Sequence, residues 1–143
     1  MGRLYLLGDL FGKVVVPQAV WDELVLDGHL RSGSEDLLNA SWIELRPVTT
    51  HASVVQVLRV SLDRGEAEAI ALAQELQPAM LLIDEKLGRE MAQHIGLPIT
   101  GIVGVLIAVK RRRLDPDPAG IARQMRENGV WIAERLIQDI ENA

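Results

Sequence analysis

Carboxylates stand at both ends of one stretch of the chain, residues 63–90, which reads DRGEAEAIALAQELQPAMLLIDEKLGRE. Glu66 opens an Ala-rich segment with a helical pattern, and Asp84 ends a short apolar run with the pattern of a strand. A third acid, Glu23, lies in the helical pattern that follows the apolar run at 13–17. Carboxylates that converge repel one another unless a cation neutralises them, and such oxygen ligands suit Mg²⁺ or Mn²⁺. The three acids therefore indicate a divalent-cation site.

The helical period gives the two glutamates of the Ala-rich segment different directions. Glu66 falls inside the apolar arc, whereas Glu68 falls beside Glu75 on the polar side. We therefore expect Glu66 to point toward the core and Glu68 toward solvent. An alternative role for Glu66 is capping, because Asp63-x-x-Glu66 resembles a capping box and the helix dipole favours an acid in the first turn.

The other two acids also have alternative roles. Asp84 could cap the helix that follows it or pair with Lys86 or Arg89, and Glu23 could be a surface glutamate. Burial of Asp84 beside apolar elements without a partner would raise its pKa and cost several kcal/mol. Capping and metal binding therefore both remain open for Asp84.

Around these acids, helical patterns alternate with short continuous apolar runs. Strands are predicted at residues 13–17, 41–48, 79–84 and 97–100. Helices are predicted at residues 3–11, 17–26, 34–40, 52–62, 64–77, 85–96, 101–113, 117–128 and 130–143, and the run at 52–62 also suits a strand. Gly96 is predicted to end the helix at 85–96, and Asp117 to cap the helix that follows it. This alternation indicates an α/β fold with a parallel sheet between helices. Sites in such sheets form outside the carboxyl ends of the strands, where Asp84 and Thr100 are expected.

Composition narrows the class of protein. The 143 residues suit a single domain, 1–143, in which residues 117–143 form an appended helical part. The chain has no cysteine, which excludes thiolate metal sites and suits a reducing cytoplasm. Its longest apolar run, 97–109, is shorter than the roughly 20 residues of a membrane span.

The net charge of −5 leaves nucleic-acid binding to a local patch. Such a patch is offered by four consecutive basic residues, Lys110, Arg111, Arg112 and Arg113. Their alternative role is to complement the dipole at the end of a helix.

Four segments together resemble one protein family. They are LFGKVVVPQAVWDELV, LDRGEAEAIALAQEL, MLLIDEKLGREMAQHIGLPITGIVGVLIAVKRRRLD and IARQMRENGVWIAERLIQDI. The resemblance is to the PIN-domain proteins, specifically the DUF3368 branch, which is similar to the VapC-type toxins of toxin–antitoxin pairs. It runs across nearly the whole chain.

The resemblance implies a three-layer α/β/α sandwich around a central, mainly parallel sheet. It also implies a ribonuclease that depends on Mg²⁺ or Mn²⁺, acts on RNA and is held inactive by an antitoxin. Carried over by motif, the metal-binding and catalytic acids are Glu23, Glu66 with Glu68 as the alternative, and Asp84 with Glu85 as the alternative. Thr100 and the four basic residues at 110–113 are the candidate nucleic-acid contacts.

The chain departs from the family pattern at its start. Family members begin with a strand that ends in an Asp, and Met1 lies in the region that follows this strand. We expect either that the start of this sequence is mis-assigned or cut, or that this gap is filled by a homodimer or by rearrangement. Two functions stay open, an active ribonuclease and an inactive PIN-like module that binds an antitoxin or a second copy. A third possibility is a phospho-acceptor domain with Asp84 as the acceptor, but the chain lacks the acidic pair that such domains need.

Overall fold

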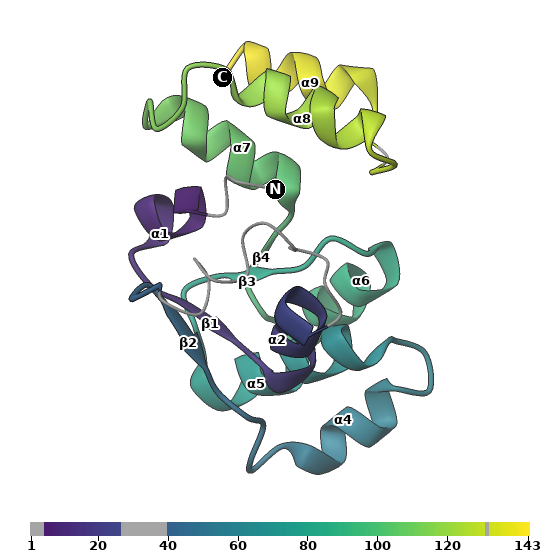
Figure 1. Cartoon of the computed structure of the whole chain (residues 1–143). Coiled ribbons are helices and arrows are strands. Elements are labelled where there is room, and N and C mark those ends of the chain that lie inside the picture. The colour runs from purple at the N-terminus through teal and green to yellow at the C-terminus, as the bar shows by residue number, and fades with distance from the viewer. Residues whose placement is uncertain (1–4, 27–39, 131) are drawn as a thin grey trace. The chain divides into compact units, whose positions relative to one another are not determined.

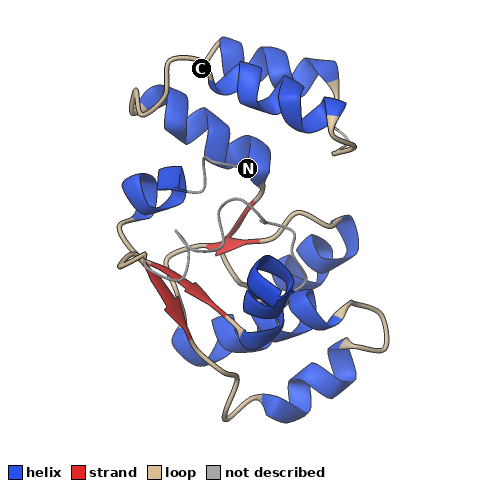
Figure 2. Cartoon of the chain, in the orientation of Figure 1, coloured by secondary structure: helices blue, strands red, loops and turns tan. Residues whose placement is uncertain are grey.

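The computed structural model describes residues 5–26, 40–130 and 132–143 (Figure 1). The chain divides into two compact units, Met1–Ile99 and Thr100–Ala143. Helices make up most of the secondary structure, and the strands are short (Figure 2). In the described residues, no helix has the length and apolar character that crossing a membrane requires.

The first unit opens with α1 (Tyr5–Phe11), which ends at Gly12 with φ at 75°. Next come β1 (Val14–Val16) and, later in the chain, β2 (Ile43–Leu45), which pair in parallel. Val14 lies opposite Ile43 in this ladder. Gly8 allows α1 to pack on an indole ring, because a methyl group at Gly8 would lie 2.6 Å from Cγ of Trp42.

Helix α5 (Arg64–Leu76) carries the core of the first unit. It packs against α2 (Gln18–Trp21), which continues as the π-helical η1 (Asp22–Leu26), and against α4 (Ala52–Leu58). Ala67 and Ile70 of α5 are fully buried. The core cluster consists of Leu58, Leu62, Ala67, Ile70, Ala73, Leu81, Ile83 and Ala92.

A second strand pair brackets helix α6 (Lys86–Ile95). β3 (Leu81–Leu82) precedes this helix and pairs with β4 (Ile99–Thr100), which follows it. The backbone N–H of Leu81 donates to the carbonyl of Pro98 at 2.7 Å. Gly96 ends α6 in the left-handed conformation, with φ at 96°, as its position after the helical pattern predicts.

Three helices form the second unit, α7 (Ile102–Arg111), α8 (Pro118–Glu127) and α9 (Glu134–Glu141). Asp117 caps α8 by accepting from the N–H of Gly120 at 3.0 Å, as predicted. The apolar faces of the three helices meet in a core of Leu106, Ala119, Ala122, Ile132, Ile137 and Ile140.

Helices alternate with short strands that form small parallel sheets, so the predicted α/β class is confirmed. The strands form two separate pairs, β1–β2 and β3–β4. A three-layer sandwich around one central sheet stays a prediction, as does a single domain over 1–143. Each predicted strand is present but only two or three residues long. The predicted helix at 34–40 lies outside the described residues up to residue 39, and the last helix begins at Glu134 rather than at 130.

Candidate functional site

The site begins with the first turn of α5. Asp63 precedes the helix in an extended conformation, and its Oδ1 accepts from the backbone N–H of Glu66 at 2.8 Å. This bond confirms the capping box that the sequence indicates. Glu66 completes the box, because its carboxylate accepts a hydrogen bond from the backbone N–H of Asp63. The Glu66 carboxylate lies in the first turn, where the helix dipole favours negative charge.

The Glu66 carboxyl is half-buried, and its pKa is raised above the ordinary 4.5. Burial is the largest cause, followed by the negative charges of Asp63, Glu85 and Glu23. A hydrogen bond from the backbone N–H of Asp63 lowers the pKa and opposes part of this shift. Three carboxylates therefore lie within electrostatic range of Glu66, and we refer to Glu23, Asp63, Glu66 and Glu85 as the acid cluster.

Two glycines let other groups come close to this cluster. A methyl group at Gly65 would lie 3.3 Å from Oε1 of Glu23, so η1 brings its acid directly over the first turn of α5. A methyl group at Gly88, in α6, would lie 2.8 Å from Cδ1 of Ile83 and 3.6 Å from Cδ of Glu66. The cluster thus gathers where η1 and the starts of α5 and α6 meet.

Glu68 does not face solvent, so that prediction is wrong. It is only 8% exposed. Its Oε1 accepts from the backbone N–H of Ala19 at 3.0 Å, and its Oε2 accepts from Nε of Arg64 at 2.7 Å. The side of α5 that appears polar in the sequence is covered by α2. Both oxygens of the buried Glu68 therefore accept hydrogen bonds, and the bond from Ala19 links α2 to α5.

Arg64 extends this connection toward the acid-bearing helix. Its Nη1 lies 3.8 Å from Oδ2 of Asp22, the residue before Glu23. Asp22 also accepts from the side-chain amide of Gln18 at 2.7 Å. Sequence reasoning passed over Arg64, although its i,i+4 spacing to Glu68 is a recognisable signal for an ion pair on a helix.

Asp84 is exposed, in the short connection between β3 and α6. Its neighbour Glu85 is also exposed and occupies the position just before α6. The charge that reaches Glu66 from this connection is that of Glu85. The choice between Asp84 and Glu85 as the acid of the site stays a prediction.

The donor atoms of the acid cluster suit a hard divalent cation, because all are carboxylate oxygens. Their arrangement is looser than a coordination sphere. Among the described residues, no three Asp, Glu, His or Cys side chains are grouped closely enough to hold a metal ion. The cluster fits Mg²⁺ or Mn²⁺ in ligand type but not in assembled geometry.

The predicted nucleic-acid contacts lie in the second unit. The Thr100 hydroxyl donates to the carbonyl of Gly101 at 3.5 Å, and a methyl group at Gly104 would lie 2.4 Å from this hydroxyl oxygen. Gly104 therefore serves close packing at the start of α7. The basic run Lys110–Arg113 spans the end of the same helix.

Comparison with known families decides the relationship of this chain to other proteins. The model of the DUF3368 family, described as a PIN domain, matches residues 1–142. The chain belongs to this family of PIN domains. No curated protein and no solved structure matches it.

PIN domains are generally nucleases and typically use divalent metal ions, so membership supports an enzyme that acts on nucleic acid. The acid cluster is the part of this PIN domain with the matching chemistry. Glu23 and Glu66, both expected from the sequence, belong to it, whereas Asp63 joins as a cap and Glu68 is occupied by Ala19 and Arg64.

Proposed function

We propose that this PIN domain is an endoribonuclease that requires Mg²⁺ or Mn²⁺ and cleaves RNA phosphodiester bonds. We further propose that it acts in the cytoplasm as the toxin of a toxin–antitoxin pair and forms a homodimer. The observation that carries the proposal is the acid cluster, in which burial and the negative charges of Asp63, Glu85 and Glu23 raise the pKa of Glu66. A carboxyl whose pKa is raised by burial and by neighbouring acids is characteristic of a functional site.

Three positions would hold the cation, namely Glu23, Glu66 and the acid at Asp84 or Glu85. A bound cation supplies hydroxide from its coordinated water and offsets the charge on the phosphate. The raised pKa of Glu66 means that this carboxyl keeps its proton to a higher pH than an ordinary glutamate. Cleavage is therefore expected to fall as the pH is lowered through the pKa of Glu66.

The remaining polar contacts position these acids. Glu68 holds the start of α2 through Ala19, and Arg64 bridges Glu68 to Asp22, directly before Glu23. Each oxygen of Glu68 accepts one hydrogen bond, from Ala19 and from Arg64. Its role in this proposal is to fix α2 and η1 on α5.

The decisive experiment is cleavage of a labelled single-stranded RNA with Mn²⁺, with EDTA as the control. Asp84→Asn and Glu85→Gln are compared with the unchanged chain, because these variants remove one charge from adjacent positions. We expect one of the two to abolish cleavage while the melting temperature stays equal or rises. Cleavage at the normal rate by both variants would contradict the proposal.

One observation favours a second candidate, an inactive PIN-like module that binds an antitoxin or another copy of itself. The described acids form no group of three that could hold a metal. This candidate predicts a stable dimer in sedimentation and no heat of binding on titration with Mn²⁺. A monomer with a saturable Mn²⁺ isotherm would exclude it.

A further inference from the structure

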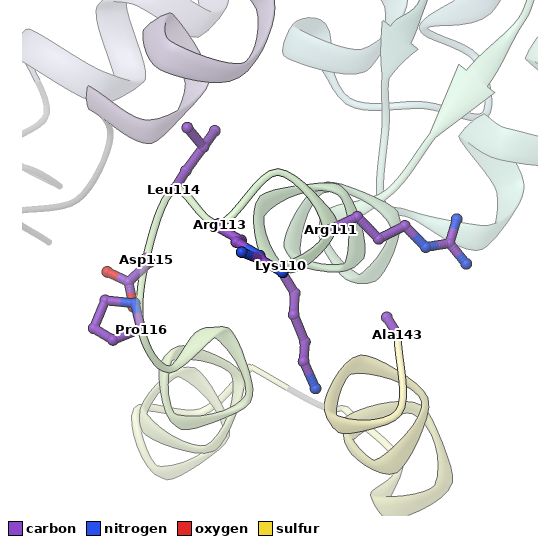
Figure 3. Close-up of a pocket in the computed structure, with 7 residues that line it drawn as sticks. All are labelled: Lys110, Arg111, Arg113, Leu114, Asp115, Pro116 and Ala143. Atoms are coloured by element: carbon purple, nitrogen blue, oxygen red, sulfur yellow. The ribbon is translucent and has the colours of Figure 1, made fainter.

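The second unit contains a pocket that the acid cluster does not use. It has a volume of about 680 Å³ and lies at the end of α7 (Figure 3). Its lining consists of Lys110, Arg111, Arg113, Leu114, Asp115, Pro116 and Ala143. A pocket of this size can accept a nucleotide-sized ligand.

Three cations line this pocket, and their charges are not offset by ion pairs. Among the described residues, Lys110, Arg111 and Arg113 take part in no salt bridge. The acid in the lining, Asp115, already accepts from the backbone N–H of Asp117 at 2.9 Å. The pocket therefore has an excess of positive charge.

The helix dipole accounts for only part of this arrangement. Lys110 and Arg111 lie in the last turn of α7, where cations are favoured. Arg113 lies beyond that turn, and its φ of 55° is in the left-handed region. The N–H of Arg113 donates to the carbonyl of Lys110 and the N–H of Leu114 to that of Val109, both at 3.0 Å. These two bonds form a Schellman motif, whose left-handed position glycine occupies most easily.

A strained position occupied by arginine instead of glycine points to a use for its side chain. The planar guanidinium of arginine matches the oxygens of a phosphate group and can bind two of them at once. Figure 3 shows Lys110 and Arg111 extending in different directions from the helix end. Cations that diverge suit successive phosphates along a strand better than one small anion.

We propose that this pocket binds the phosphate backbone of single-stranded RNA through the side chains of Lys110 and Arg113. The inference rests on the proposed function for its choice of RNA. It adds a binding site in the second unit to the acids of the first. The dipole explanation treats Arg113 as dispensable, whereas this proposal makes it a principal contact.

Arg113→Gly separates the two explanations, and Arg135→Gly is its matched control. Both remove one positive charge from an exposed position of the second unit, but Arg135 lies in α9 and is not part of the pocket lining. Glycine at 113 relieves the left-handed strain and should raise the melting temperature, whereas glycine at 135, within a helix, should lower it. Binding of a fluorescein-labelled single-stranded RNA is measured by anisotropy in EDTA, so that cleavage plays no part.

We expect Arg113→Gly to weaken RNA binding by about 3- to 10-fold and to reduce the slope of log K against log salt by about 0.7. Arg135→Gly should bind within about 2-fold of the unchanged chain. Equal affinities for the two variants, or tighter binding by the more stable Arg113→Gly, would overturn the proposal.

Two further measurements identify the ligand. We expect that poly-glutamate does not displace the RNA. Displacement that depends on Arg113 in the same way would assign the pocket to an acidic protein segment and overturn the proposal. Lys110→Ala should weaken binding in parallel with Arg113→Gly. A chain that binds RNA through Arg113 yet never cleaves it would contradict the proposed function and leave this inference standing.

Discussion

Residues 1–99 and residues 100–143 carry opposite charge. The first unit has eight Lys and Arg residues against fourteen Asp and Glu residues, a net charge of −6. The second has seven against six, a net charge of +1. The overall charge of −5 conceals this division. An acidic unit repels a polyanion, and a basic helix end attracts one. In the function and the binding site proposed above, the first unit would therefore hold the cation and the second unit the phosphates.

The same contrast appears on a smaller scale along α5. Glu66 is surrounded by other acids, and its pKa is raised. Glu68 and Glu75 lie farther along the helix and accept hydrogen bonds, Glu68 from Ala19 and Arg64, and Glu75 from the backbone N–H groups of Thr49 and His51. One helix thus carries one acid in an unfavourable setting and two that stabilise the fold. The acid in the unfavourable setting is the candidate for function.

The largest expected effect is on catalysis. Glu66→Gln should reduce RNA cleavage with Mn²⁺ by about a thousand-fold or more, because it removes a charged oxygen from the acid cluster. RNA binding in EDTA should be unchanged, since the basic pocket is intact. Cleavage and binding that fall together would show that the two units do not divide these tasks.

A core substitution in each unit tests whether the two units also unfold independently of each other. Ile70→Ala and Ile137→Ala each leave a cavity at a fully buried position and should lower the free energy of unfolding by about 3 kcal/mol. Hydrogen exchange followed by mass spectrometry should show faster exchange mainly in residues 1–99 for the first and mainly in 100–143 for the second. An even rise over the whole chain would mean that both units unfold as one.

Removal of Glu68 should have an intermediate effect. Glu68→Ala leaves the backbone N–H of Ala19 and the side chain of Arg64 without their acceptor and should cost about 2 kcal/mol in the free energy of unfolding. Glu90→Ala, at an exposed position of α6, is the matched control and should change stability little. Denaturant unfolding measures both, and equal midpoints would refute the role of Glu68 as the fastening of α2.

The smallest expected effect is the pH dependence of stability. A raised pKa means that ionised Glu66 opposes folding, so Glu66→Gln should raise the melting temperature at pH 7, with the gain vanishing as the pH falls to about 4.5. Hydrogen bonds from His51 and Thr49 lower the pKa of Glu75. Glu75→Gln should therefore lower the melting temperature at pH 7, and this loss should vanish below about pH 4.5. Shifts of the same sign would contradict the assignment of the two acids.

The sequence predicted the helices well because their ends carry local signals. Asp63 and Asp117 were recognised as caps and Gly96 as a stop, and each acts within a few residues of its own position. The predicted strands overlap the observed ones but are too long, because an apolar run does not show how many of its residues pair with a neighbouring strand. The run at 79–84 pairs only over Leu81–Leu82.

Side-chain environments were less predictable because they depend on elements far apart in the sequence. The helical period placed Glu68 on a polar face, but helix α2, about 50 residues earlier, covers that face. Likewise, nothing near Asp84 indicates that Glu85 is the acid whose charge reaches Glu66. The sequence pattern identified the candidate acids, but it could not show which of them already accept hydrogen bonds from other parts of the chain.

Gly65 sets how close the acids of two helices can come. A single methyl group there would lie 3.3 Å from Glu23, tight enough to displace that carboxylate by a few tenths of an ångström. Alanine at this position would also favour the helix by about 1 kcal/mol, so the spacing could be altered without loss of fold. Position 65 is thus an uncharged control point, where the size of one side chain would tune the proposed cation affinity while the number of carboxylates stays the same.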